Sequence, residues 1–335
     1  MACAPLGWGL VRAVLIVNPN ATSTSASGLA LLAHALESRV ELTVERTDHR
    51  GHAIEIAQRA AQDGVDVVIV HGGDGTVNEV VNGLLGPPGR LTARRVPAVA
   101  VVPGGSANVF ARSLGIPHDP IEATNLLIDL LGEYRQTHAW RRIGLMDCGE
   151  RWGVFTAGMG VDGEVVASVE AHRKRGRKQK GVTATRYIRS AIPTVLHSAR
   201  REPTLTLRLP DRDPVTGVHF VFVSNASPWT YANARPVYTN PDCRFETGLG
   251  VFATTSMSVW RNLGLVRRML SKKGKVKAAH LVRDDDVAWL QVTSDTPIAT
   301  QIDGDYLGLR EEMMFRSVPD ALDVVAVVAP PQKPS

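Results

Sequence analysis

The chain has 335 residues, which is long enough for two domains that each bury a core. Its apolar content of 44% and charged content of 21% are ordinary for a globular protein, and no apolar run approaches the roughly 20 residues that span a bilayer. The net charge of +5 is modest, and the three cysteines are too few and too scattered for a disulfide framework or a zinc site.

The N-terminal stretch runs directly into a predicted first strand, Val11–Val17. The apolar segment Leu6–Val17, which includes this strand, is interrupted by Arg12 and has no convincing cleavage site, so we do not expect a signal peptide. The strand ends in Asn18-Pro19 and a loop rich in Ser and Thr, and a helix follows from about residue 29 to 38. On the pattern alone, this loop is a plain turn with helix-capping hydroxyls.

A second strand is predicted at Val40–Thr47, where apolar and polar residues alternate. It leads through a short turn to Gly51-His52-Ala53 and a helix with an apolar face. We interpret His52 as a helix-start residue that packs locally rather than as a catalyst.

The stretch Val65–Gly86 organises the chain. Its first six residues are mostly β-branched and predict a strand buried on both faces, which ends in the glycine-rich turn Gly72-Gly73-Asp74-Gly75. Apolar residues then recur at spacings of three and four, which predicts a helix. Glycines let a ligand approach the backbone, and the N–H groups and dipole of a helix N-terminus favour phosphate. We expect Asp74 to hold Mg²⁺ with a nucleotide or to orient the attacking group; the alternative is a simple helix cap.

A second glycine turn follows the next predicted strand, Val96–Val102. It contains Gly104, Gly105, Ser106 and Asn108. Because parallel strands with right-handed crossovers bring such turns to one rim of the sheet, two of them beside one crevice favour phosphate binding more than either alone.

The alternation of strands and helices predicts a parallel α/β nucleotide-binding domain over residues 1–135. Short alternating segments separated by turns then predict an antiparallel, sandwich-like β domain over residues 136–329, with a tail at 330–335. Expected strands in this half include Leu205–Leu209, Val218–Val223, Val287–Val292, Pro297–Ile302 and Ala321–Val328.

The stretch GGDGTVNEVVNGL resembles the nucleotide-binding segment of bacterial diacylglycerol kinase-like lipid kinases, which are relatives of sphingosine and ceramide kinases. NAD kinases share only its GGDG core. The Asn18-Pro19 turn, Thr47 with Gly-His-Ala, and the second glycine turn match the same family in order. The resemblance implies an NAD kinase/diacylglycerol kinase-like fold, with ATP and Mg²⁺ as cofactors and Asp74 as metal ligand. It implies that ATP contacts Asn18, Pro19, Thr47, Gly72, Gly73, Asp74, Gly75, Thr76, Asn78, Glu79, Gly104, Gly105, Ser106 and Asn108.

The segment Asp303-Gly304-Asp305 is a hairpin turn by pattern, since Asp-Gly is a strong hairpin signal. The resembled family carries Asp-Gly-Glu here and draws its catalytic base from it, which implies catalytic roles for Asp303, Asp305 and Asp74. We expect Asp303 to accept the proton and Asp305 to orient the base or the metal. The chain departs from the family at Val109 and Thr247, where an Asp is usual, so we do not transfer the family's structural Mg²⁺ site.

The expected activity is an ATP-dependent lipid kinase that transfers the γ-phosphate to a lipid hydroxyl, with diacylglycerol giving phosphatidic acid as the first choice. The alternatives are an NAD kinase and a catalytically inactive nucleotide- or membrane-binding protein of the same fold. The basic runs Arg173–Lys180 and Arg267–Lys277 are a solvated face or dock the protein on anionic membrane. We expect no nucleic-acid partner, a cytoplasmic location on the inner face of the membrane, and edge strands that would permit a homodimer.

Overall fold

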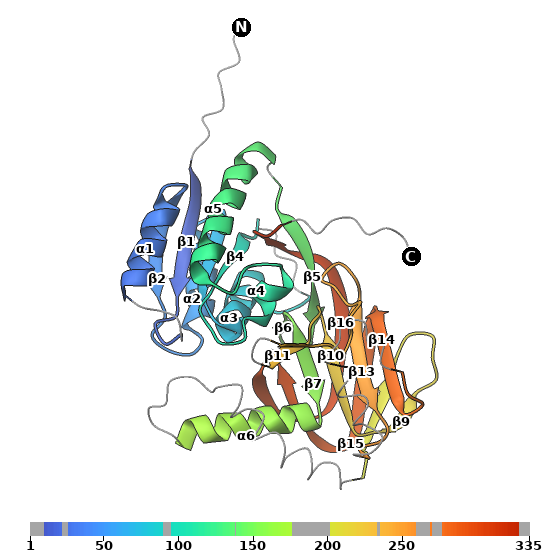
Figure 1. Cartoon of the computed structure of the whole chain (residues 1–335). Helices are drawn as coiled ribbons and strands as arrows, with labels where there is room; N and C mark the ends of the chain where they lie inside the picture. The colour runs from blue at the N-terminus through green and yellow to red at the C-terminus, as the bar shows by residue number, and fades with distance from the viewer. Residues whose placement is uncertain are drawn as a thin grey trace.

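The computed structural model describes residues 10–21, 26–89, 95–137, 139–175, 202–232, 235–258, 269 and 277–327 (Figure 1). Its first half alternates strands and helices: β1 (Val11–Val17), α1 (Ala26–Glu37), β2 (Val40–Arg46), α2 (His52–Gln62), β3 (Val67–Gly72), α3 (Asp74–Leu85), β4 (Ala98–Pro103), α4 (Val109–Ser113) and α5 (Pro120–Thr137). The four strands are parallel in the order β4-β3-β1-β2. This arrangement confirms the predicted parallel α/β unit.

Both faces of the central strands β3 and β4 are buried, which explains their apolar and mostly β-branched composition. Helices α1 and α5 cover one face, where Leu32 and Leu131 pack on Leu15. Helices α2, α3 and α4 cover the other face, over Ile16 and Val68.

The second half is mainly antiparallel. Its elements are β5 (Arg141–Asp147), β6 (Trp152–Gly153), β7 (Thr156–Met159), α6 (Val161–Arg175), β8 (Leu205–Arg208), β9 (Val215–Val218), β10 (Phe220–Ser224), β11 (Thr230–Ala232), β12 (Arg235–Val237), β13 (Leu249–Thr254), β14 (Leu281–Val287), β15 (Trp289–Ile302) and β16 (Asp305–Val324). Helix α6 contacts β15 near its N-terminal end and extends away from the sheet (Figure 1), and Gly163 permits the contact because an added Cβ would lie 2.2 Å from Ala299 O.

The long strand β16 connects the two halves. It pairs with β15 through its first part and with β5 through its second part, and Val324 then pairs with Val99 of β4. One hydrogen-bonded path therefore runs from β14 through β16 to β2. The division into domains at residues 135 and 136 stays a prediction.

The strand predictions in the second half need correction in three places. The expected strand Val218–Val223 is divided, because β9 ends at Val218 and β10 begins at Phe220. The expected strand Val287–Val292 is interrupted, because β14 ends at Val287 and β15 begins at Trp289. The expected final strand from Ala321 is the end of β16, which stops at Val324 after an irregularity in which Asp320 has φ 50°. Strand β5 and helix α6 were not predicted.

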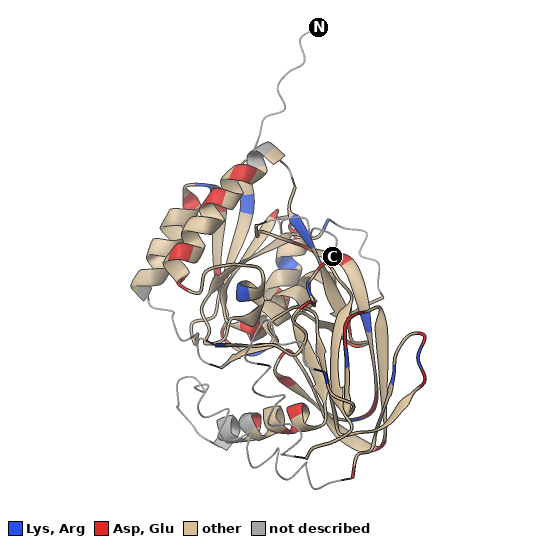
Figure 2. Cartoon of the chain, turned by 45° about the vertical axis from the view of Figure 1, so that its right-hand side comes forward, with Lys and Arg blue, Asp and Glu red and all other residues tan. Residues whose placement is uncertain are grey.

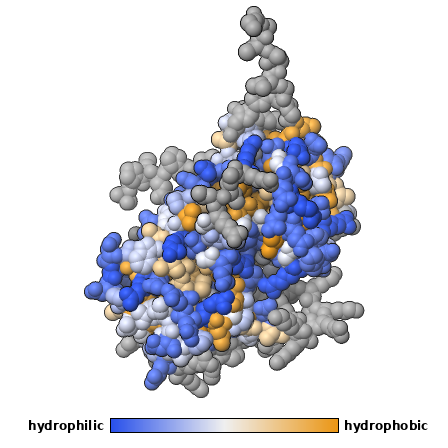
Figure 3. Space-filling view, turned by 180° about the vertical axis from the view of Figure 1, so that it is seen from behind, coloured by the Kyte–Doolittle hydropathy of each residue, from blue (hydrophilic) through white to orange (hydrophobic). Residues whose placement is uncertain are grey.

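The described surface carries acidic and basic residues over both halves (Figure 2), and the face seen from behind is mostly hydrophilic with small apolar patches (Figure 3). Most of the two predicted basic runs, residues 176–180 and nearly all of 267–277, lies outside the described residues. Among the helices that the structure describes, none is long and apolar enough to cross a bilayer.

Candidate active site

The two glycine-rich turns pack backbone against backbone at the carboxyl ends of β3 and β4. Gly104 N donates to Gly72 O at 2.8 Å, and an added Cβ on Gly105 would lie 2.7 Å from the Cα of Gly73. Side chains at these positions would force the turns apart. The structure therefore brings together the two predicted turns, and close packing between them accounts for Gly104 and Gly105.

Gly75 has no such structural reason to be glycine. It is exposed in the first turn of α3, and an added Cβ would have nothing within 4 Å. The first N–H groups of a helix lack partners inside the helix and attract anions together with the helix dipole. Ser106, on the neighbouring turn, is also exposed. This open corner can accept phosphate oxygens.

Asp74 caps the neighbouring helix. Its two carboxylate oxygens accept N–H groups from Val109 and Phe110, both at 3.0 Å. Burial raises the pKa of Asp74, and these hydrogen bonds and Arg112 oppose that shift. The role of Asp74 as a metal ligand stays a prediction. Its oxygens fit a hard cation such as Mg²⁺, because a carboxylate oxygen that accepts one hydrogen bond keeps a further lone pair.

The remaining predicted nucleotide contacts near the strand ends also join neighbouring elements. Asn18 donates from Nδ2 to Thr76 Oγ1 at 3.2 Å, Pro19 is exposed beside it, and Thr47 Oγ1 donates to Val17 O at 3.4 Å. Glu79 accepts the N–H of Gly51 at 3.0 Å, and Asn108 forms two hydrogen bonds across its turn with Gly105. These contacts place all of the predicted turns at one edge of the sheet.

Asn78 connects α3 to the hairpin between β15 and β16. It is fully buried and donates from Nδ2 to Asp303 Oδ2 at 2.5 Å. Asp303 also accepts backbone N–H groups from Val154, Phe155 and Thr156 at 2.7–2.9 Å, and only 5% of it is exposed. Desolvation raises the pKa of Asp303 to about 6, although the three backbone donors and Arg151 oppose the shift. Four donors thus hold this carboxylate inside the protein.

The hairpin has a second buried support. Gln301 accepts the N–H of Gly304 at 2.8 Å and donates to Asp162 Oδ2 at 2.5 Å. Asp162 lies at the start of α6, and burial raises its pKa to about 6.

Asp305 lies at the surface of the same hairpin, with a quarter of its side chain exposed. Its carboxylate pairs with Arg50 Nη2 at 2.9 Å and with Arg151 Nη1 at 3.4 Å. Arg50 also pairs with Glu170 of α6 at 3.1 Å, and Arg151 Nη2 donates to Asn78 Oδ1. The structure therefore brings Asp305 together with Arg50, from the turn between β2 and α2, and with Arg151 of the second half.

A hollow of about 340 Å³ lies next to this hairpin. Ile302 and Leu307, which flank the turn, contribute apolar lining together with Met313, and Arg151 lies at its wall. The hollow therefore combines an apolar floor with a cation beside Asp305.

Sequence reasoning missed Arg50 and Arg151. Each is a single arginine with no periodic or motif signal, and their shared partner Asp305 is more than 150 residues away in the chain. Only the fold brings them together.

A family model described as "Diacylglycerol kinase catalytic domain" matches residues 12–137. The chain is 33% identical over 139 residues to the "Probable lipid kinase YegS-like" of Chromohalobacter salexigens, a match covering 42% of this chain and 41% of that protein. It is 38% identical over 122 residues to the diacylglycerol kinase of Staphylococcus aureus strain bovine RF122, covering 35% of this chain and 36% of that one. The chain thus spans about two fifths of the length of these curated relatives.

The match in fold extends further. A crystal structure of a diacylglycerol kinase from Bacillus anthracis str. Sterne superposes with a TM-score of 0.67 at 19% identity, over 95% of this chain and 97% of that one. The same architecture therefore continues through the antiparallel half. The likeness to the diacylglycerol kinase catalytic domain therefore lies in residues 12–137, and the likeness of the remaining residues is one of fold.

Proposed function

We propose that the chain is an ATP-dependent lipid kinase that transfers the γ-phosphate of ATP to a lipid hydroxyl, with diacylglycerol as acceptor and phosphatidic acid as product. The carrying observation is that the open N-terminus of α3 and the hairpin with Asp305 meet at one edge of the sheet, joined by Asn78 and Arg50. Phosphoryl transfer needs mainly positioning and charge stabilisation, which such an edge can supply.

In this proposal the phosphates of ATP lie against Gly75 and Ser106, where the backbone is open. Asp74 would hold Mg²⁺ together with phosphate oxygens, and the ion supplies charge neutralisation at the γ-phosphate. Arg50 of the first half and Arg151 of the second half would stabilise the developing negative charge.

The acceptor would place its apolar body in the hollow lined by Ile302 and Leu307 and its hydroxyl near Asp305. The hydroxyl oxygen forms a bond to the γ-phosphorus while the bond to the bridging oxygen breaks, so ADP leaves. The hydroxyl proton goes to Asp305. We assign this step to Asp305 rather than to Asp303, because four donors already occupy the buried Asp303 carboxylate.

The protein would dock on the membrane surface through Arg173–Lys180 and Arg267–Lys277. Each well-placed basic residue contributes about 1 kcal/mol to the free energy of binding to an anionic membrane. Binding to vesicles with and without anionic lipid tests this part separately from catalysis.

The test is transfer of labelled γ-phosphate from ATP to diacylglycerol and to a total membrane lipid extract. We expect labelled phosphatidic acid from the wild type and about 100-fold less from the Asp305→Asn variant, since a positioned base contributes a factor of that order. The Asp305→Glu variant, which has the side chain usual in the resembled kinases, should keep most of the activity.

Stability measurements separate the two aspartates. Asp305→Asn should change the free energy of unfolding by less than about 1 kcal/mol, because its ion pairs are solvent-accessible. Asp303→Asn should cost more, about 1–3 kcal/mol, because it turns an amide donor toward buried N–H groups. Full transfer by a folded Asp305→Asn variant would refute the proton assignment, and no labelled lipid from wild-type protein that binds ATP would refute the kinase proposal.

A further inference from the structure

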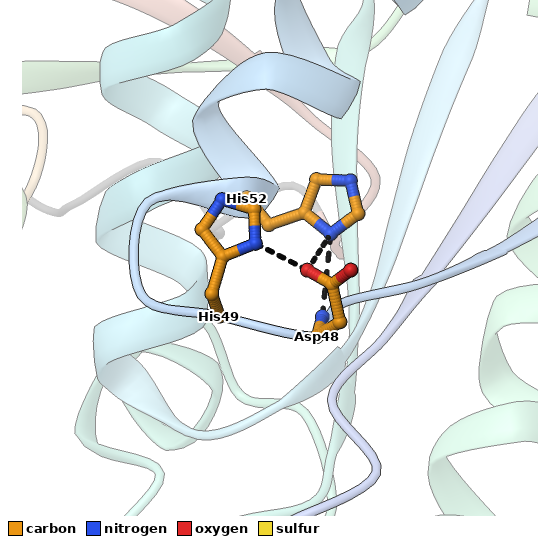
Figure 4. A group of neighbouring side chains, drawn as sticks. All are labelled: Asp48, His49 and His52. Atoms are coloured by element: carbon orange, nitrogen blue, oxygen red, sulfur yellow. Dashed lines mark hydrogen bonds and ion pairs between the residues drawn. The ribbon is translucent and has the colours of Figure 1, made fainter.

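Two histidines and an aspartate converge in the turn between β2 and α2 (Figure 4). Asp48 and His49 precede α2, and His52 is its first residue. One ligand atom from each side chain lies within 4.8 Å of the others, and the two imidazole rings are stacked nearly parallel, 7° apart. In Figure 4 both Nδ1 atoms point toward the same carboxylate oxygen of Asp48.

Both ring nitrogens of His49 lie beside carboxylates: Nδ1 beside Asp48 Oδ1, and Nε2 3.5 Å from Glu55 Oε1. When the imidazole is neutral and its proton lies on Nε2, toward Glu55, Nδ1 is the nitrogen that can bind a metal ion. A carboxylate on the far nitrogen is also the usual outer partner of a histidine that binds a metal.

His52 presents a lone pair in the same direction. The backbone N–H of Asp48 donates to His52 Nδ1 at 3.2 Å, so this nitrogen acts as an acceptor. The same nitrogen lies only 2.8 Å from Asp48 Oδ1. With both imidazoles neutral at Nδ1, three ligand atoms lie at one point. One proton can bridge only one nitrogen–oxygen pair, whereas one metal ion can bind all three atoms.

We propose that Asp48, His49 and His52 form a binding site for a divalent transition-metal ion of the Zn²⁺ type, which fastens the turn between β2 and α2. Two imidazoles and a carboxylate suit Zn²⁺, Co²⁺ or Ni²⁺, whereas Mg²⁺ and Ca²⁺ prefer oxygen ligands alone. With bonds of 2.0–2.2 Å, donors on one such ion lie about 3.3 Å apart. The two imidazole nitrogens are both closer than this to Asp48 Oδ1, so the carboxylate would move slightly away from them to admit the ion. About half of the His49 side chain is exposed, which leaves an open coordination position for water.

This turn also carries Arg50 of the candidate active site, whereas Asp48, His49 and His52 are not among the groups placed there. Gly51, within it, reaches Glu79 of α3, and Arg50 reaches Asp305. An ion bound by His49 and His52 would therefore fix the backbone of Arg50 at the position from which its side chain pairs with Asp305.

The test is titration of the metal-free full-length protein with Zn²⁺ by calorimetry, without nucleotide or lipid. We expect one site per chain in the wild type. His49→Ala and His52→Ala should each weaken it by more than about tenfold, and Glu55→Gln by about tenfold, as for loss of an outer partner. Co²⁺ should give a visible absorption spectrum in the wild type that is lost in His49→Ala, and Mg²⁺ should not compete.

The matched control is His34→Ala, since His34 is an exposed histidine that also lies beside a carboxylate, 3.8 Å from Glu37. This variant should bind Zn²⁺ as the wild type does. Circular dichroism establishes that each variant is folded, and the exposed position of His49 makes its substitution the decisive one. Absence of wild-type binding, or equal binding by wild type and a folded His49→Ala/His52→Ala double variant, would overturn the proposal.

Discussion

Substitution of Asp74 can test its structural role and its proposed metal-binding role. Both of its carboxylate oxygens accept N–H groups of α4, which is the structural role. An Asp74→Asn substitution keeps one acceptor oxygen and turns an NH₂ group toward a backbone donor. We expect the free energy of unfolding to fall by about 1–3 kcal/mol. Urea denaturation measures this change, and ATP titration of the same variant shows whether Mg²⁺-dependent affinity falls as well. Unchanged stability with lost affinity would contradict the capping role.

Asp162 should make the free energy of unfolding fall as the pH rises. Burial raises its pKa to about 6 from the ordinary value of 3.8, so the folded protein holds a proton that the unfolded chain releases between these values. The stability contributed by neutral Asp162 is thus fully present below about pH 3.8 and is lost as the pH rises to about 6. The neutral Asp162→Asn variant should gain about 3 kcal/mol relative to wild type between pH 4 and pH 7. Urea denaturation of both proteins at the two pH values measures it; a constant difference would show that Asp162 ionises normally.

At the scale of elements, two glycines in adjacent turns should respond in opposite ways to the same substitution. Gly105→Ala drives a methyl group to within 2.7 Å of the Gly73 backbone, so we expect a loss of stability of about 1–3 kcal/mol. Gly75→Ala meets nothing within 4 Å, and alanine favours a helix by about 0.5–1 kcal/mol, so the fold should be retained or stabilised.

Gly75→Ala, which should keep the fold, is expected to weaken ATP binding. A methyl group at Gly75 covers the exposed N-terminus of α3, and we expect ATP affinity to fall about tenfold, the value of one hydrogen bond to a charged group. Thermal denaturation and ATP titration of both variants provide the comparison. Equal ATP affinity in wild type and Gly75→Ala would place the phosphates elsewhere.

The sequence predicts best those elements whose apolar periodicity is uninterrupted and whose ends are marked by turn residues. Strand β1 matches its predicted bounds, and α3 follows its glycine turn as expected, because apolar periodicity and turn residues act within a few positions. Helix α6 could not be recognised, since charged residues dominate its C-terminal end and Gly163 interrupts its start. The turn at Asp303-Gly304 was predicted from its pattern, and both residues have positive φ, 51° and 80°.

The predicted site could be assembled only in part. Parallel-strand topology brings Gly72 and Gly104 to one rim by rule, so their proximity could be expected. Asp303 was predicted as the base, but its burial depends on three backbone N–H groups about 150 residues earlier in the chain. No local pattern encodes such a contact.

At the scale of the whole molecule, the α/β half shares its core with the antiparallel half. Phe110 of α4 is fully buried and packs edge-on against Phe245 at 5.5 Å, and Leu322 and Val324 belong to the same cluster. We therefore expect residues 1–137, produced alone, to lack a cooperative thermal transition. Far-UV circular dichroism during heating, beside the full chain, measures this. A fragment that unfolds cooperatively at the temperature of the full chain would show that the predicted boundary marks an independent domain.

The two halves are joined both at the strand pairing and beside the candidate active site. Val325 donates its N–H to Val99 O beside β4, and Asn78 binds Asp303 beside the candidate active site. A body fixed at two such points has no free hinge, because rotation about one attachment breaks the buried hydrogen bonds of the other. Substrates would then meet in a cleft whose shape is set before they arrive, and any closing movement falls to side chains such as Arg50 and to surface loops.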